Sequence, residues 1–130
     1  MRPLLRTLLF VLAMLAPVAT SMADVDTEAA IPSAGALELI VVEAEGCIYC
    51  KLFRRDVLPT YQASEQAKDL PVRFVDINDV EADHLSFKSE VDIVPTFVVV
   101  KSQQEVGRIS GYVGPENFFH SISYLLASAP

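Results

Sequence analysis

The order of predicted elements, β-α-β-α-β-β-α, indicates an α/β domain with a central mixed sheet and flanking helices. Three observations predict it: apolar runs of strand length over residues 37–42 and 72–77, helical spacing of apolar residues between them, and two adjacent strand-like runs after Pro95. Strands that alternate with helices favour a parallel βαβ unit. The closing pair is typical of a hairpin and adds an antiparallel strand.

Residues 1–23 have the pattern of a secretory signal peptide. Two arginines flank the start of an apolar run from Leu8 to Ala19, and Ser21-Met22-Ala23 supplies small residues before a cut. The run is interrupted before it reaches the roughly 20 apolar residues of a membrane-spanning helix. We therefore expect cleavage after Ala23, a periplasmic location and no membrane insertion of the mature chain. An uncleaved membrane anchor is the alternative.

The composition after the leader indicates one acidic domain. The whole chain of 130 residues has a net charge of −7, and without the two leader arginines 8 basic and 17 acidic residues remain, a net charge of −9. Such a surface argues against nucleic acid and anionic lipid as partners. Residues 24–36 are polar, small and turn-rich, which predicts a flexible lead-in. Residues 37–130 form the predicted domain.

The first strand and the helix after it have clear patterns. Residues 37–42 are apolar except for Glu38 and rich in β-branched side chains, as in a strand that is buried on both faces. From Cys50 onward the apolar spacing becomes three and four, which predicts a helix. Pro59 falls within this helix and predicts a kink or a break. The helical stripe consists of Cys50, Phe53, Val57 and Tyr61.

The rest of the chain continues the alternation. After the strand over residues 72–77, residues 78–91 are polar with sparse apolar positions, which predicts a surface helix capped by Asn78 or Asp79. Residues 96–100 and 105–110 form the predicted hairpin. Gly114-Pro115 then opens a final helix, since proline is favoured at the first helical position. Its apolar face consists of Phe118, Ile122, Leu125 and Leu126.

The stretch EAEGCIYCKLF holds both cysteines of the chain, Cys47 and Cys50, and three uses of them compete. A structural disulfide closes a very short loop and contributes little through the unfolded state. A zinc site needs four ligands, whereas His84 and His120 lie in amphipathic stretches where solvent-facing histidines are ordinary. Two thiolates alone suit Cu(I), so a Cu(I) carrier is an alternative.

The third use is thiol–disulfide exchange. The pattern strand-Gly-Cys-x-x-Cys-helix places Cys47 at the helix N-terminus, where unpaired N–H groups and the helix dipole favour its thiolate. Cys50 lies one turn further in. Cys47 is then the nucleophile that attacks a partner's disulfide, and Cys50 is the resolving thiol that releases the partner. A regulatory module that binds its partner in one oxidation state is an alternative that uses the same pair without turnover.

From Leu37 to Leu126 the chain resembles the thioredoxin-like family of thiol–disulfide oxidoreductases. The cysteine pair carries this resemblance together with the segment VDIVPT, residues 91–96. The resemblance implies a thioredoxin-like fold and a cis Val94–Pro95 bond that faces the cysteines. It also implies that an extended client segment pairs with the Val94 backbone beside Pro95 and Tyr49, as substrate-binding residues. Gly111 matches another glycine of the family, and no cofactor is implied.

Several positions depart from the family pattern. The usual Trp-Cys-Gly-Pro-Cys is replaced by GCIYC, residues 46–50. The buried acid of the family falls near Val41, so Glu43 or Glu45 is the candidate to replace it. A basic side of the helix, made by Lys51, Arg54 and Arg55, is either a solvated face or a group that stabilises the Cys47 thiolate or steers an acidic partner.

A narrower resemblance concerns the residues around and after the second cysteine. CxYCK and FRRDVLP, residues 53–59, are similar to the small periplasmic thioredoxin-like proteins that accompany bacterial sulfur-oxidation systems. This resemblance implies a dedicated client protein with a disulfide or thiol, which the chain keeps reduced. A membrane or periplasmic dithiol protein is the electron donor that such a cycle needs.

Overall fold

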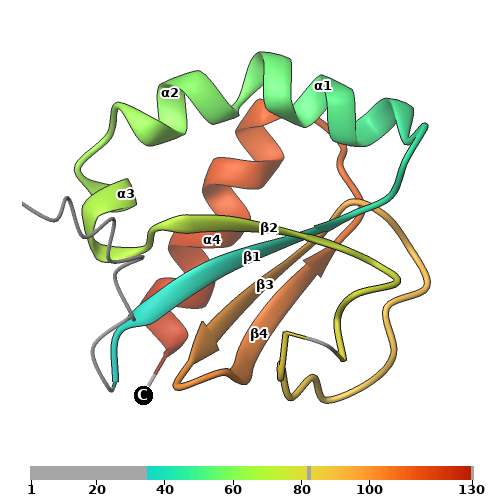
Figure 1. The fold of residues 1–130 in the computed structure, drawn as a ribbon. Coiled ribbons are helices and arrows are strands. Elements are labelled where there is room, and N and C mark those ends of the chain that lie inside the picture. Colours follow the sequence, from blue (N-terminus) through green and yellow to red (C-terminus); the bar gives the residue numbers. More distant parts are fainter. Residues whose placement is uncertain (1–34, 82, 130) are drawn as a thin grey trace, which may run out of the picture.

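The computed structural model describes residues 35–81 and 83–129 (Figure 1). The predicted signal peptide, 1–23, and most of the predicted lead-in, 24–36, lie outside these residues. The described elements are β1 (Leu37–Glu43), α1 (Ile48–Asp56), α2 (Leu58–Gln62), α3 (Gln66–Asp69), β2 (Val72–Asp76), β3 (Thr96–Lys101), β4 (Gln104–Ser110) and α4 (Pro115–Ser128).

The sheet is mixed, with the strand order β2-β1-β3-β4. Strand β1 pairs in parallel with β2 and antiparallel with β3, and β3 and β4 form the expected hairpin. Because β1 lies inside the sheet and both faces are covered, its four residues Leu39 to Val42 are fully buried. The continuous apolar pattern of this strand is explained by that position.

Helices α1, α2 and α4 pack on one face of the sheet and share its larger apolar cluster. Phe53 of α1 lies at its centre, 4.6 Å from the Phe97 ring and 5.1 Å from the Phe118 ring. The expected break is confirmed: α1 ends at Asp56, and α2 begins at Leu58 with Pro59 in its first turn. The four stripe residues are all buried: Cys50, Phe53, Val57 and Tyr61.

The other face is covered by an irregular segment instead of a helix. The predicted helix over residues 78–91 is wrong: the described residues between β2 and β3 form turns and bends, and His84 has a φ of +55°. We call residues 77–94 the strap. Six of its apolar side chains cover the second apolar cluster: Ile77, Val80, Leu85, Phe87, Val91 and Val94.

Strand β4 holds the strap in place through Glu105 and Arg108. The Glu105 side chain, only 3% exposed, forms an ion pair with Arg108 and accepts a hydrogen bond from the Lys88 backbone N–H at 2.8 Å. Arg108 also donates to the carbonyl oxygens of Ser89, at 2.8 Å, and Glu90, at 3.1 Å. These bonds satisfy strap carbonyls that a helix would have satisfied internally, and they fix the chain shortly before Pro95.

The Glu105 carboxylate should make stability depend on pH. The hydrogen bond from Arg108 lowers the pKa of Glu105, against the opposing effect of burial, and the Lys88 N–H lowers it further. This stabilisation is complete above the unfolded-state pKa, about 4.3, and is lost as the pH falls through the lower folded-state pKa. Glu105→Gln should therefore lower the free energy of unfolding at pH 7 by about 1–3 kcal/mol. The difference from the wild type should narrow below pH ~4, as measured by urea unfolding.

Glu65→Gln is the matched control, because the Glu65 side chain is 88% exposed in its pair with Lys68. It should change stability by less than about 0.5 kcal/mol at any of these pH values. Parallel pH curves for the wild type and Glu105→Gln would contradict the assignment.

Candidate active site

Cys47 occupies the N-cap position of α1. The chain leaves β1 at Glu43 and turns through Gly46, whose φ of +77° favours glycine. The Cys47 backbone is extended, and its Sγ accepts a hydrogen bond from the Cys50 N–H at 3.1 Å. Because the first N–H groups of a helix lack partners within the helix, this position favours negative charge on the sulfur.

Cys47 and Cys50 form a disulfide, with their Cα atoms 5.3 Å apart. The two residues differ in accessibility: Cys47 is partly exposed, whereas Cys50 is 4% exposed and belongs to the core. The intervening Ile48 and Tyr49 side chains are 61% and 55% exposed. The pair therefore presents one sulfur to solvent at an apolar surface and keeps the other beneath it.

The segment before β3 lies against the outer sulfur. The Val94–Pro95 bond is cis, and the Val94 carbonyl oxygen lies 3.6 Å from Cys47 Sγ. The sulfur carries no proton in the disulfide, so this approach is a contact here and becomes a possible hydrogen bond only in the thiol form. The Gly111 N–H donates to the Pro95 carbonyl at 2.9 Å, and Thr96 Oγ1 donates to the Ile93 carbonyl at 2.7 Å.

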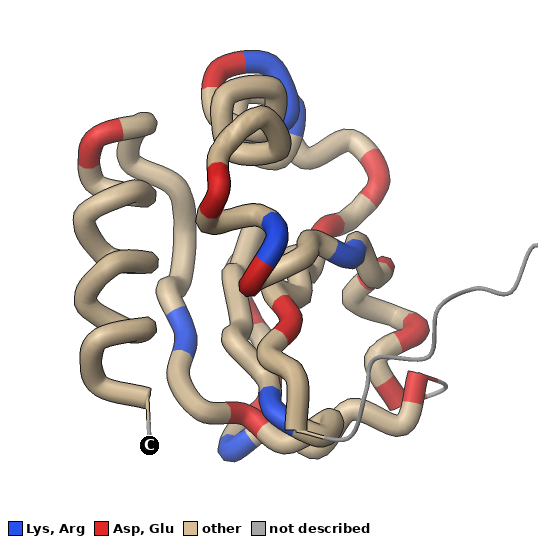
Figure 2. Tube along the Cα trace, turned by 90° about the vertical axis from the view of Figure 1, so that its left-hand side faces the viewer, with Lys and Arg blue, Asp and Glu red and all other residues tan. Residues whose placement is uncertain are grey.

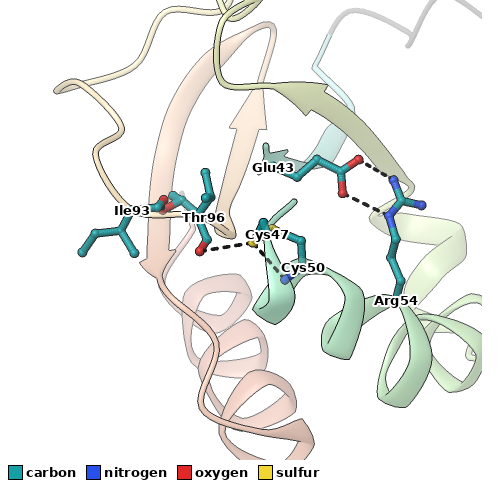
Figure 3. Close-up of a disulfide and its surroundings, with 7 residues drawn as sticks. Glu43, Cys47, Cys50, Arg54, Ile93 and Thr96 are labelled. Carbon is teal, nitrogen blue, oxygen red and sulfur yellow. Dashed lines mark hydrogen bonds and ion pairs between the residues drawn. A yellow bond between two sulfur atoms is a disulfide. The ribbon is translucent and has the colours of Figure 1, made fainter. Parts of the chain in front are cut away.

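An ion pair lies on the opposite side of the disulfide. Figure 3 shows Glu43 and Arg54 on this side, while Ile93 and Thr96 lie across the cysteines from them. Arg54 donates to both Glu43 carboxylate oxygens, at 2.6 and 3.0 Å, and its guanidinium lies 3.6 Å from the centre of the Phe74 ring. The Glu43 carboxylate is thus engaged by Arg54.

A cavity of about 380 Å³ joins this ion pair to the disulfide. Its wall includes Glu43, Asp76, Lys51 and Cys50. Of the two candidates to replace the family's buried acid, Glu43 lines the cavity with an engaged carboxylate, and Glu45 is exposed. Val41 itself is fully buried among apolar side chains.

Arg55, the second arginine of the basic side, has a different partner from Arg54. It donates to both carboxylate oxygens of Asp56, and these hydrogen bonds lower the pKa of Asp56. Each arginine is therefore neutralised by a carboxylate, and neither has Cys47 as its hydrogen-bond partner. Lys51 is exposed on the same helix.

An open groove of about 770 Å³ runs from Tyr49 along α1, between this helix and the segments around Val94 and Gly111. Of its residues, Tyr49, Arg55, Val94 and Gly111 were singled out from the sequence, whereas the apolar residues of its walls were missed. An available signal was the uncharged run ISGYVGP, residues 109–115, directly before the last helix. The groove residues missed as site residues include Leu52, Ile93, Tyr112 and Val113.

Metal-ligating side chains and membrane-spanning helices were sought among the described residues. His84 and His120 are both exposed. In residues 35–81 and 83–129, no three or more His, Cys, Asp or Glu side chains are grouped so that they could hold a metal ion. None of the helices in that part of the chain has the length and apolar character needed to cross a bilayer.

Comparisons with known proteins agree with this geometry. A family model described as a thioredoxin-like domain matches residues 25–126. The periplasmic thioredoxin SoxS from Paracoccus pantotrophus is 28% identical with a TM-score of 0.67, over 70% of this chain and 96% of that chain. Mitochondrial thioredoxin 3 from Saccharomyces cerevisiae is 25% identical with a TM-score of 0.51, over 68% and 78%. None of the curated proteins matches the chain in sequence.

The family match covers most of the chain. The cysteine pair lies at the start of α1, beside the cis peptide bond to Pro95. The chain belongs to the thioredoxin-like family and is a thiol–disulfide oxidoreductase.

Proposed function

We propose that Cys47 is the nucleophile and Cys50 the resolving thiol of a periplasmic oxidoreductase that reduces a dedicated client protein. The observation that carries this proposal is the unequal placement of the two sulfurs. Cys47 is partly exposed at a helix N-cap and accepts an N–H hydrogen bond, whereas Cys50 is buried one turn below. A low-pKa, accessible thiol with a resolving neighbour is the arrangement that thiol exchange requires.

The cycle begins from the reduced pair. The Cys47 thiolate attacks one sulfur of a client disulfide, and the other client sulfur leaves as a thiolate that takes up a proton. The Cys50 thiol then loses its proton and attacks Cys47 Sγ, which forms the intramolecular disulfide and releases the first client sulfur as a thiolate. Two electrons pass to the client, and a membrane or periplasmic dithiol protein returns two electrons to the pair.

Client binding would use the segment beside the sulfur. Val94 offers its backbone to an extended client strand, and its carbonyl oxygen lies 3.6 Å from Cys47 Sγ. Tyr49 lies on the other side and is half exposed.

The periplasmic location and the link to sulfur oxidation have two supports. One is the signal-peptide pattern of residues 1–23. The other is the similarity to a periplasmic thioredoxin, SoxS, together with the CxYCK and FRRDVLP segments. On these grounds the client is a protein of a bacterial sulfur-oxidation system, and the chain keeps its thiol reduced.

Substitution of the two cysteines tests the mechanism. Cys47→Ser should abolish disulfide reduction, because no thiolate remains to attack the client. Cys50→Ser should accumulate a mixed disulfide with the client, since the second step lacks its thiol. Both outcomes can be measured by non-reducing gels and mass spectrometry of periplasmic fractions from a sulfur-oxidising host. Full turnover by Cys47→Ser would refute the assignment, and a trapped client outside sulfur oxidation would refute the proposed pathway.

The ionisation of Cys47 in the reduced protein gives a second test. The rate of its alkylation by iodoacetamide should increase with pH, and the midpoint of this increase should lie below about 8.5, the pKa of a free cysteine. The reason is that the helix N-terminus stabilises the thiolate. Cys50 should react far more slowly, since it is 4% exposed. Mass spectrometry of the alkylated peptides distinguishes the two sites. An apparent pKa of 8.5 or above at Cys47 would contradict the role of the N-cap position.

A further inference from the structure

The groove beside Cys47 has apolar walls that are unusually exposed. Among the described residues, five large apolar side chains are strongly exposed, and three of them line this groove: Tyr49, Ile93 and Val113, which is 81% exposed. A fourth, Ile48, adjoins Cys47 in the chain. An exposed apolar patch of this kind marks a surface that another molecule covers.

The charged groups of the groove come from α1 alone. Among the described residues, Arg55 and Asp56 are the only charged ones that line it. The opposite wall, formed by residues 111–115, carries no charge, and α4 beyond it has no Lys or Arg and a single acidic residue, Glu116 (Figure 2). Any charge preference of the groove is therefore set by one arginine and one carboxylate.

Tyr112 adds an unpaired donor to this pair. Its hydroxyl oxygen is buried and has no hydrogen-bond partner among the described residues. Burial raises the pKa of Tyr112, and the charge of Asp56 raises it further while Arg55 lowers it, so the hydroxyl stays protonated close to both groups. A buried donor without an acceptor costs free energy and is rare in folded proteins.

The hydrogen-bonding groups of the groove are thus unbalanced. Arg55 has N–H groups beyond the two that bind Asp56, the Tyr112 hydroxyl has no partner, and Asp56 is the only described carboxylate that lines the groove. A further acceptor would serve these unused donors: Asp56 would accept from the Tyr112 hydroxyl, and Arg55, whose side chain is 71% exposed, would turn to the new acceptor. A carboxylate suits this position best, because a guanidinium binds it with two parallel, charge-assisted hydrogen bonds.

We propose that the groove selects client segments that carry an Asp or Glu side chain about three residues from the reactive cysteine, with Arg55 and Tyr112 as specificity-determining residues. The proposal rests on the proposed function and names the client chemistry that the same site prefers. The distance of about three residues follows from the geometry of α1. Arg55 is eight positions after Cys47, a rise of roughly 12 Å along a helix. An extended client covers that distance in three to four residues.

Competition between synthetic peptides tests the proposal. Ten-residue peptides would carry one cysteine as a 2-thiopyridyl disulfide and Glu, Gln or Lys three residues away, on either side, with valine between. The Cys50→Ser protein would be offered equal amounts of two peptides, and mass spectrometry would give the ratio of the captured forms. The Glu peptide should exceed the Lys peptide by about threefold or more in one of the two placements, as expected for a partly exposed charge pair.

Variants in the same Cys50→Ser background identify the source of the preference. Arg55→Gln should abolish the preference for the Glu peptide. Tyr112→Phe should weaken this preference, because no hydroxyl can then replace Arg55 as the hydrogen-bond donor to Asp56. Lys68→Gln is the matched control, since it removes one positive charge from α3, outside the groove, and should keep the preference. Equal capture of Glu and Lys peptides in both placements would overturn the proposal.

The two proposals fail in different ways. Capture of peptides without charge preference overturns the client chemistry alone, whereas no capture of any peptide overturns the role of Cys47 as well. Tyr112→Phe gives an independent readout in the free protein. Removal of an unpaired buried hydroxyl should leave the melting temperature unchanged or raise it. A clear fall would show that the hydroxyl has a partner in the free protein and would overturn the donor count.

Discussion

The pairing of Val42 with Thr96 decides where the redox pair and the cis-proline meet. These residues lie opposite each other at one end of the antiparallel pair β1–β3. One residue beyond Val42 the chain leaves the sheet toward Cys47, and one residue before Thr96 it enters from Pro95. A shift of this register by one residue would exchange the side chains of the two buried faces and so disrupt both apolar clusters. The 3.6 Å approach of Val94 to the sulfur is therefore fixed by burial of the two central strands.

The strap shows how the second face of the sheet is completed without a helix. Its backbone runs beside β4, where Ser86 forms a parallel bridge with Gln104: the Ser86 N–H donates to the Gln103 carbonyl, and the Ser86 carbonyl accepts from the Glu105 N–H. Arg108 then binds carbonyls further along the strap. Thus β4, which contributes no cysteine and no groove residue, holds the segment that leads into Val94. The sheet edge supports the site through polar contacts, while the helical face supports it through apolar packing.

Much of this architecture could be predicted because its causes are local. The continuous apolar run of β1, the stripe from Cys50 to Tyr61 and the stop at Pro59 each express burial or backbone geometry within a few residues. The conformation of the strap could not be predicted from local patterns. Its apolar positions Val80, Leu85 and Val91 are five and six residues apart, which fits no helical face. Its conformation is set by Arg108, whose role no local pattern reveals. The donor imbalance at Tyr112 likewise depends on α1 lying beside residues 111–115.

Glu43, at the end of β1, illustrates how the surroundings of the disulfide change when Val41 stands in place of the family's buried acid. Val41 lies in the apolar cluster beneath α1, where a carboxylate would be desolvated without a partner. Glu43, two residues further on the same face, is at the rim instead, with 25% of its side chain exposed. There it binds Arg54, which is fixed in turn over Phe74. The carboxylate therefore ties α1 to β1, and Cys50 faces an open cavity with charged walls instead of a buried acid.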